Sequence, residues 1–522
     1  MRLGVDFGTT RTIVASVDRG NYPVVSFQDP AGDAHEYYPS VVAWEDDRLS
    51  FGFEALAAGE RGAPMVRSFK RALASPDVNP ETTIAVGDQD VRILDVMTGF
   101  FESLRQALES SSSVRGGKVA DIQAAVAVPA HAHGPQRFLT LEAFRRAGFE
   151  VSAMINEPSA AGFEYTHRQG RTVTSRRTRV IVYDLGGGTF DASLVNVDGK
   201  SHEVIDSLGL NHLGGDDFDV VLGECALMQA GISREALPPR AFAELVEECR
   251  EAKEQLAPQS KRIALEVDGS PLMLKVEDFY ASCAPLVEAT VEAMRPLVGG
   301  LDEGSPLMTD IAGIYLVGGA SSLPLVPRVL RERFGRRVHR SPYPAASTAI
   351  GLAIAADATA GYSLTDRLSR GFGVFREARD GQSLAFDPIL PREAKVTSQE
   401  AVMVSRAYPA FHNVGWFRFV EYSTVDAAGQ PRGDIVPFAE VIFPFDPALQ
   451  GKPANELRAI PVRRADAGHQ IEERYVIDPH GIIEVHLRDL HTGYTQKHAL
   501  AAPGPRAEQT QGKGKAKARS RR

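Results

Sequence analysis

The stretch from Val180 to Val195 reads Val-Ile-Val-Tyr-Asp-Leu-Gly-Gly-Gly-Thr-Phe-Asp-Ala-Ser-Leu-Val, and it decides the fold of this chain. Apolar β-formers on both sides of a glycine cluster predict a buried strand, a tight turn and a second strand. The three glycines at 186–188 have no Cβ, so the backbone N–H groups of the turn can approach an anion such as a phosphate. Asp184 and Asp191 flank the turn, and carboxylates beside a phosphate site predict a hydrated Mg²⁺ ion.

The start of the chain repeats this arrangement in the segment Asp6-Phe-Gly-Thr-Thr10, which lies between two apolar runs. Asp6 corresponds in this pattern to Asp184. One glycine-rich turn is usually only a turn, but two copies with the same order of Asp, Gly and Thr favour a polyphosphate held between two facing hairpins. The pattern is not a Walker loop, because Leu194 stands where that motif requires its first glycine before Gly199-Lys-Ser201.

The composition limits the class of protein. At 522 residues, with 43% hydrophobic and 24% charged residues, the chain is typical of a soluble protein with two or more domains. Its net charge is −9, and subtracting the six basic residues among the last ten leaves about −15, which argues against general nucleic-acid binding. Three scattered cysteines form no disulfide framework or metal motif. With no signal peptide or membrane-length apolar run, we expect a cytoplasmic protein.

The order of the expected elements indicates a duplicated α/β plan. The halves before and after about residue 170 each begin with strands and continue with helices, which predicts a cleft between them. Asn156-Glu157-Pro158 falls at a strand-to-helix junction, where α/β sheets place ligands. Strands are expected at 38–44, 122–128, 151–155 and 314–317, and helices at 52–61, 137–147, 244–256, 323–333 and 345–356.

The character of the sequence changes near residue 359. We divide the chain into an α/β domain at 1–358, a linker at 359–370, an all-β module of short alternating runs at 371–500, and a tail at 501–522. The tail is rich in Pro, Gly, Gln and Lys, so we expect it to be disordered. Contact with nucleic acid or another anionic surface is expected only through this basic tail.

At these residues the chain resembles the seventy-kilodalton heat-shock protein family, the DnaK-like chaperones of the actin-like ATPase superfamily. Four segments carry the resemblance: Asp6 to Thr10, Ile155 to Pro158, Val182 to Asp191, and His212-Leu-Gly-Gly-Asp-Asp-Phe-Asp219. It covers residues 1–358 strongly and 369–490 weakly. It implies a duplicated actin-like, ribonuclease H-like ATPase domain followed by a smaller β-sandwich-like substrate-binding module.

The resemblance also implies roles for single residues. The expected catalytic residues are Lys70, which would position the attacking water, and Glu157, Asp184 and Asp191. Mg²⁺ would be held through waters by Asp6 and Asp184. Pro129 and Arg137 would pass the nucleotide state to the second domain. The residues expected to bind ATP are Gly8, Thr9, Thr10, Gly186, Gly187, Gly188, Thr189, Gly214, Gly215, Lys253, Gly318 and Gly319.

Several positions depart from the family pattern. Ser322 replaces an arginine that stacks on adenine, Arg250 replaces a ribose-binding glutamate, and Ala257 replaces a serine. These changes predict weaker and less adenine-selective nucleotide binding. Segment 362–368 offers only two leucines for docking of the linker, which predicts a small apolar contact area. Too little sequence follows Leu487 for the family's helical lid.

The favoured interpretation is a lidless chaperone-like protein that hydrolyses ATP slowly and binds unfolded or partner polypeptides through its β module. A co-chaperone or nucleotide exchanger could assist it. An ATP-dependent actin-like scaffold or regulatory protein with one dedicated partner is the alternative, and a small-molecule kinase of the same superfamily is the weakest. Stimulation of ATP turnover by unfolded peptide separates the first interpretation from the second.

Overall fold

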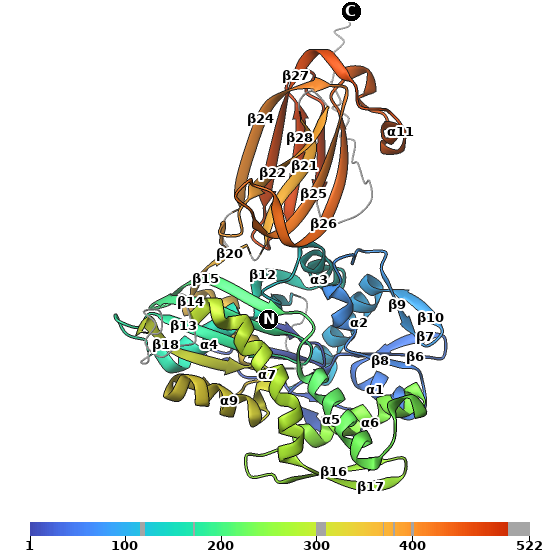
Figure 1. The fold of residues 1–522 in the computed structure, drawn as a ribbon, viewed down its shortest axis with the longest axis vertical. Coiled ribbons are helices and arrows are strands. Elements are labelled where there is room, and N and C mark those ends of the chain that lie inside the picture. Colours follow the sequence, from blue (N-terminus) through green and yellow to red (C-terminus); the bar gives the residue numbers. More distant parts are fainter. Residues whose placement is uncertain are drawn as a thin grey trace, which may run out of the picture.

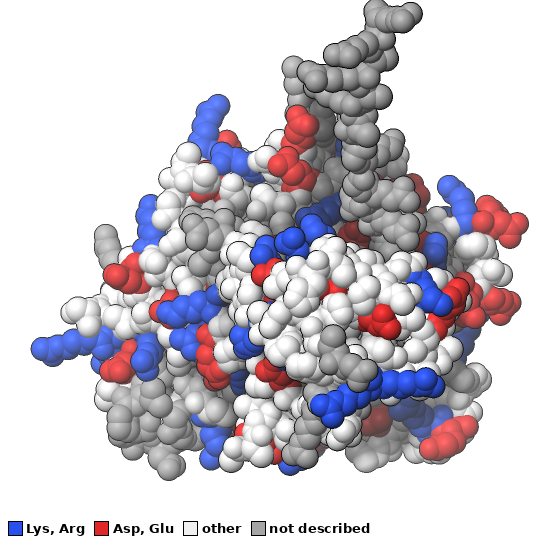
Figure 2. Space-filling model, turned by 90° about the horizontal axis from the view of Figure 1, so that it is seen from above, with Lys and Arg blue, Asp and Glu red and all other residues white. Residues whose placement is uncertain are grey.

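The computed structural model describes residues 1–114, 121–170, 173–298, 309–368, 370–378, 382–397 and 401–499. An α/β body carries an elongated β module at one end (Figure 1). The expected basic tail at 501–522 lies outside the described residues. Over the face seen in Figure 2, basic and acidic side chains are interspersed. No helix in the described ranges has the length and apolar character needed to span a lipid bilayer.

The first half of the α/β body, lobe 1, is built on a five-stranded sheet of order β12-β11-β1-β2-β5. The first two strands form the predicted antiparallel hairpin, and β11 runs parallel to β1. The five strands are β1 (Arg2–Phe7), β2 (Arg11–Ser16), β5 (Tyr38–Pro39), β11 (Gln123–Val128) and β12 (Glu150–Asn156). The other elements are β3 (Phe27–Gln28), β4 (Ala34–His35), β6 (Val41–Glu45), β7 (Arg48–Phe51), β8 (Met65–Arg67), β9 (Thr83–Val86), β10 (Gln89–Arg92), α1 (Gly52–Glu60), α2 (Ile93–Ser110) and α3 (Gly134–Arg146).

The second half, lobe 2, repeats this plan in a seven-stranded sheet of order β19-β18-β13-β14-β15-β20-β23. Strands β13 and β14 are the hairpin around the glycine turn, with Asp184 directly opposite Asp191. The strands belonging to the lobe are β13 (Arg179–Leu185), β14 (Phe190–Asp198), β15 (Ser201–Leu210), β18 (Ile311–Val317) and β19 (Val338–Arg340). The other elements are α5 (Gly215–Ala230), α6 (Pro239–Glu254), β16 (Arg262–Val267), β17 (Ser270–Lys275), α7 (Val276–Val298) and α9 (Leu325–Phe334).

Two helices pack against each other between the lobes, α4 (Glu157–Gln169) and α10 (Ser347–Ala356). A Cβ at Gly351 would lie 1.8 Å from the carbonyl oxygen of Ala160, so only glycine allows this approach. The small residues of α10 therefore allow the two helices to pack closely. The duplicated α/β architecture inferred from the sequence is confirmed.

The β module consists of two four-stranded sheets, β22-β21-β25-β26 and β24-β27-β28-β29. Aromatic and aliphatic side chains from both sheets, among them Phe372, Phe419 and Tyr475, share one buried core, so the sheets pack as a sandwich. The strands are β21 (Gly371–Ala378), β22 (Ser383–Leu390), β24 (Val402–His412), β25 (Val414–Val425), β26 (Pro431–Pro444), β27 (Arg464–Ile477), β28 (Ile483–Asp489) and β29 (Thr495–Ala499). A short helix, α11 (Ala454–Arg458), follows β26.

The linker forms a strand in the lobe 2 sheet. β20 (Ser363–Arg367) pairs in parallel with β15, and β23 (Lys395–Thr397) of the module pairs with β20. Asn156 donates from Nδ2 to Asp366 Oδ2 over 2.8 Å. The two leucines are therefore only part of the contacts of the linker, which also include backbone pairing with β15 and a hydrogen bond to the half-buried Asp366.

The module also contacts lobe 1 directly. The Gly134 N–H donates to Glu421, at 3.0 and 3.1 Å from the two carboxylate oxygens. A Cβ at Gly134 would lie only 1.8 Å from the Phe438 ring. Ile482 of the module packs into the core of lobe 1. The β module is thus docked on the α/β body through lobe 1 and the linker.

Candidate active site

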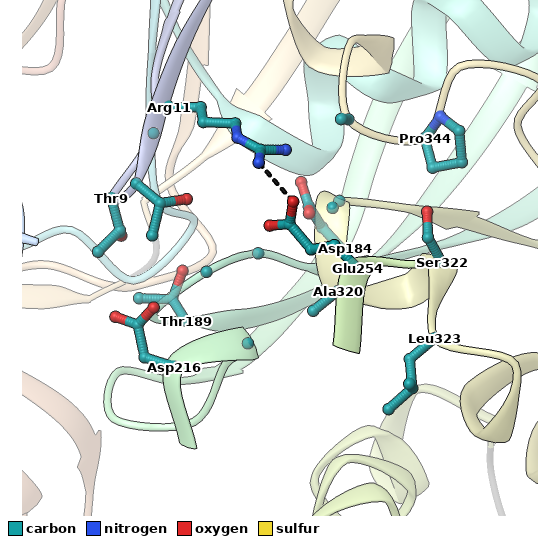
Figure 3. A pocket seen from close by; sticks show the side chains of 18 of the residues that line it. Thr9, Arg11, Asp184, Thr189, Asp216, Glu254, Ala320, Ser322, Leu323 and Pro344 are labelled. Atoms are coloured by element: carbon teal, nitrogen blue, oxygen red, sulfur yellow. Dashed lines mark hydrogen bonds and ion pairs between the residues drawn. The ribbon is translucent and has the colours of Figure 1, made fainter. Parts of the chain in front are cut away.

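A cavity of about 300 Å³ lies between the two lobes, where the two glycine hairpins face each other (Figure 3). Fourteen of the sequence-predicted residues line it: Asp6, Gly8, Thr9, Thr10, Lys70, Glu157, Asp184, Gly186, Gly187, Thr189, Gly215, Lys253, Gly318 and Gly319. Three do not: Gly188, Asp191 and Gly214. The structure thus brings together most of a set that is spread over more than 300 positions of the sequence.

The glycines let the two hairpins approach each other closely. A Cβ at Gly187 would lie 3.0 Å from the Thr10 hydroxyl oxygen, and a Cβ at Gly188 would lie 3.0 Å from that of Thr9. Larger residues would fill the space between the turns. The hydroxyls of one hairpin therefore face the bare backbone of the other, as a polyphosphate cradle requires.

Gly214 supports this cradle from behind. A Cβ at Gly214 would lie 2.6 Å from the Gly187 backbone. The backbone N–H groups of Gly215 and Asp216, at the start of α5, donate to the carbonyl oxygens of Gly186 and Gly187 at 2.9 and 2.8 Å. The acidic glycine turn at 212–219 thus fixes the position of the glycine turn at 186–188.

Lys70 reaches the cavity from a short 3₁₀ helix, Phe69–Ala74. Its Nζ lies 2.8 Å from Glu157 Oε1, and both side chains are buried. Burial alone would lower the pKa of Lys70, but the negative charges of Glu157 and Asp6 outweigh burial and raise it. The residue is therefore a fixed cation at the inner end of the cavity.

Buried carboxylates surround this lysine. Burial, and then the charge of Glu157, raises the pKa of Asp6 to about 7 and that of Asp191 to about 8. The same two causes raise the pKa of Asp184 well above its usual range. One lysine does not balance four acidic groups, so a divalent cation would be electrostatically favoured here. The donors are oxygens, which suits a hard ion such as Mg²⁺.

Asp191 lies behind the cavity wall, where its Oδ1 accepts a hydrogen bond of 3.1 Å from the Ala130 N–H. Ala130 follows Pro129 at the end of β11, so this contact joins the glycine hairpin of lobe 2 to lobe 1. On the module side of lobe 1, Arg137 donates from its guanidinium to Asn156 Oδ1 over 2.5 Å. Asn156 precedes the catalytic candidate Glu157 and also contacts the linker.

The lining of the cavity also includes positions that carry no basic side chain. Ser322, Pro344 and Ala345 line it without a cation at these three positions. Arg250 lines it too, but its guanidinium contacts Asp216, Asp219 and Glu247. These three carboxylates hold Arg250 in place within the cavity wall.

Among the lining residues that the sequence did not identify are two of opposite charge. Arg11 and Glu254 line the cavity and form an ion pair of 2.5 Å across it. They are 243 positions apart, so no local spacing connects them. The one feature of the sequence that could have indicated Arg11 is its position directly after Thr10 of the first glycine motif.

Comparison with known proteins gives the same family as these motifs. The family model described as Hsp70 protein matches residues 2–369. The chaperone protein DnaK of Thermotoga neapolitana is 29% identical over 517 residues, covering 95% of this chain and 79% of the relative. A chaperone protein HscA homolog of Pseudomonas fluorescens is 28% identical, with 94% and 76% covered. The DnaK of Mesomycoplasma hyopneumoniae strain J is 30% identical, with 69% and 58% covered. The chain belongs to the Hsp70 family.

Proposed function

We propose that this chain binds Mg²⁺ and ATP in the cavity between the lobes, hydrolyses ATP slowly to ADP and phosphate, and binds polypeptide through its β module. Hsp70 family members are ATPases, and the named relatives are chaperones. The observation that carries the proposal is the convergence of both glycine hairpins and the Lys70–Glu157 pair on one cavity.

The residues present divide the chemistry between them. The Thr9, Thr10 and Thr189 hydroxyls and the backbone N–H groups of the 186–188 turn would hold the phosphates. Mg²⁺, held by Asp6 and Asp184 through waters, would neutralise phosphate charge and orient the triphosphate.

The attacking water would be positioned at the end of the cavity where Lys70 and Glu157 lie. Lys70 would donate a hydrogen bond from Nζ to this water, and Glu157 keeps the ammonium group in place. Glu157 lines the cavity beside Lys70, so its carboxylate would take up the proton that the water releases, and Asp191, behind the cavity wall, would be a second acidic group near that water. Burial of all three side chains excludes competing solvent.

For the polypeptide site we propose the outer side of β24. A second cavity of about 300 Å³ lies between β24 and the end of β21, lined by Arg376, Tyr408 and Phe411 among others. Among the described strands β24 forms the edge of its sheet, so an extended chain could add to it by backbone hydrogen bonds. Met403 and Phe411 of this strand are 61% and 36% exposed, which offers apolar contacts to a client.

The floor of this second cavity is rigid. Arg376 contacts both Glu473 and Asp387, and the Tyr408 hydroxyl donates to Glu473 over 2.5 Å. Glu473 is fully buried, so breaking this network would leave a buried charge without its partners. A site with a fixed floor and an open strand edge suits binding of segments with varied sequences.

The test is ATP turnover with and without an unfolded model peptide, together with peptide affinity by fluorescence anisotropy. We expect stimulation of turnover by peptide, and weaker peptide binding after Met403→Ala or Phe411→Ala. Leu384→Ala is the matched control, because Leu384 is a 56% exposed apolar residue on β22, the edge strand of the other sheet. Equal effects of all three substitutions would contradict the assignment of the site to β24.

A further inference from the structure

One ion pair crosses the cavity from lobe to lobe. Arg11, at the start of β2 in lobe 1, contacts Glu254, at the end of α6 in lobe 2, over 2.5 Å. Figure 3 shows the Arg11 side chain extending over the cavity toward Glu254, between Thr9 on one side and Ser322 on the other. The guanidinium also lies 4.5 Å from the centre of the Tyr37 ring.

Arg11 is held less firmly than the other cations that line the cavity. The side chains of Lys70 and Lys253 are 9% exposed and that of Arg250 is 15% exposed. Lys253 contacts Asp219 and the Gly215 carbonyl oxygen, and Arg250 has three carboxylate partners. The Arg11 side chain is 38% exposed, and Glu254 is its single carboxylate partner among the described contacts.

This position favours a change of partner. Exposed ion pairs contribute little to stability, so the Arg11–Glu254 contact is easily broken. A triphosphate carries several negative charges, and a guanidinium binds phosphate oxygens through two parallel hydrogen bonds. Arg11 directly follows the Thr9 and Thr10 pair that would hold those phosphates.

We propose that Arg11 is a phosphate-binding residue for which Glu254 and the nucleotide compete. The proposal rests on nucleotide binding in this cavity. Release of Arg11 from Glu254 is then part of nucleotide entry, and the return of Arg11 to Glu254 assists departure. Glu254 acts as a competing carboxylate that lowers affinity, and Arg11 raises it.

The other explanation is that the pair only ties the lobes together. A similar tie exists nearby, where Arg67 Nε of lobe 1 lies 3.2 Å from Glu247 of lobe 2. Neither Arg67 nor Glu247 lines the cavity. If Arg11–Glu254 were also only a tie, removing either partner would have the same consequence. Competition instead predicts opposite consequences for the two partners.

The experiment is calorimetric titration of the full chain with ATP in the presence of Mg²⁺, using Arg11→Ala, Glu254→Gln and Arg67→Ala. We expect about tenfold weaker binding for Arg11→Ala, because one charge-assisted contact to phosphate is lost. Glu254→Gln should bind several-fold more tightly, and Arg67→Ala should match the unmodified chain. Thermal unfolding of each variant checks that the fold is retained, which the partial exposure of all three side chains favours.

A second titration uses adenosine, which has no phosphate, in place of ATP. Its affinity should not change in Arg11→Ala, whereas an equal loss for adenosine and ATP would overturn the phosphate assignment. A change in the same direction for Arg11→Ala and Glu254→Gln would overturn the competition. If the unmodified chain binds no ATP, the proposed function itself is contradicted. If the unmodified chain binds ATP and only the variants behave differently from expectation, the proposal for Arg11 alone is contradicted.

Discussion

Substitution of Gly134 by alanine should release the β module from the α/β body. The new Cβ would lie 1.8 Å from a carbon of the Phe438 ring, so the ring must move. In the docked arrangement the Phe438 side chain is 8% exposed, and the centre of its ring lies 5.6 Å from the centre of the Phe372 ring. The shift would also disturb the hydrogen bonds from the Gly134 N–H to Glu421.

The magnitude follows from these contacts. Burying a phenylalanine side chain contributes about 1.5–3 kcal/mol. A hydrogen bond to a carboxylate contributes about 1.5–3 kcal/mol more. If half of this sum is lost, docking weakens by about 1.5–3 kcal/mol, which is roughly a 10- to 150-fold change in the docking equilibrium.

The assay is amide hydrogen exchange of the linker strand β20 and of the start of α3. We expect Gly134→Ala to lose protection in both segments, with the core strand β13 unchanged. Phe438→Ala is the matched control, and adding Gly134→Ala to it should cause little further loss, because the clash is already relieved. Full protection of β20 in Gly134→Ala would refute the docked interface described above.

Three further predictions concern the cavity and the linker. Lys70→Ala should lower the rate of ATP hydrolysis by about a hundredfold or more and leave ATP binding intact, which single-turnover kinetics and calorimetry will separate. Burial raises the pKa of Asp366 from 3.8 to about 6, so the docked linker binds a proton more readily than the free linker. Docking should therefore strengthen as the pH falls from 7 through 6, and Asp366→Asn should remove this dependence in hydrogen exchange. Ser322→Arg should tighten binding of ATP by about 0.5–2 kcal/mol through stacking on the base, measured by titration, and an unchanged affinity would show that the base lies elsewhere.

The sequence predicted those parts of the fold that depend on local patterns. Both hairpins have a strict order of apolar strand, Asp, glycine turn and second strand, and the structure pairs them as expected. The helix expected from Arg137 begins at Gly134 instead. His133 caps it by accepting the Gln136 N–H at Nδ1 over 3.3 Å, and Pro135 occupies the first turn. Histidine is not among the usual capping residues, so apolar periodicity alone placed the start too late.

The site depends on long-range contacts, and local patterns do not specify these. Lys70 and Glu157 are 87 positions apart, and a lone Lys-Arg pair is normally solvated surface. The family resemblance located Lys70 and implied Glu157 as an acidic partner, and the structure gives their contact as a hydrogen bond of 2.8 Å. The pair of Arg11 and Glu254 has no counterpart in the motifs used, so the sequence offered no means of joining its members.

The leucines of the linker gave an incomplete account of its contacts. Its two leucines indicated a small apolar contact, whereas the structure docks it by strand pairing with β15 and through Asp366. Backbone hydrogen bonds are available to any sequence, so they leave no compositional signal.

The most direct test of the central claim is the rate of phosphate release from ATP by the unmodified chain and by Asp184→Asn, each with and without Mg²⁺. We predict slow hydrolysis that requires Mg²⁺, and a rate about a hundredfold lower in Asp184→Asn because one charge near the metal is lost. The variant should keep its thermal stability, since a neutral side chain relieves repulsion among the buried carboxylates. Equal rates for the two proteins, or hydrolysis independent of Mg²⁺, would contradict the assignment of this cavity as an ATPase site.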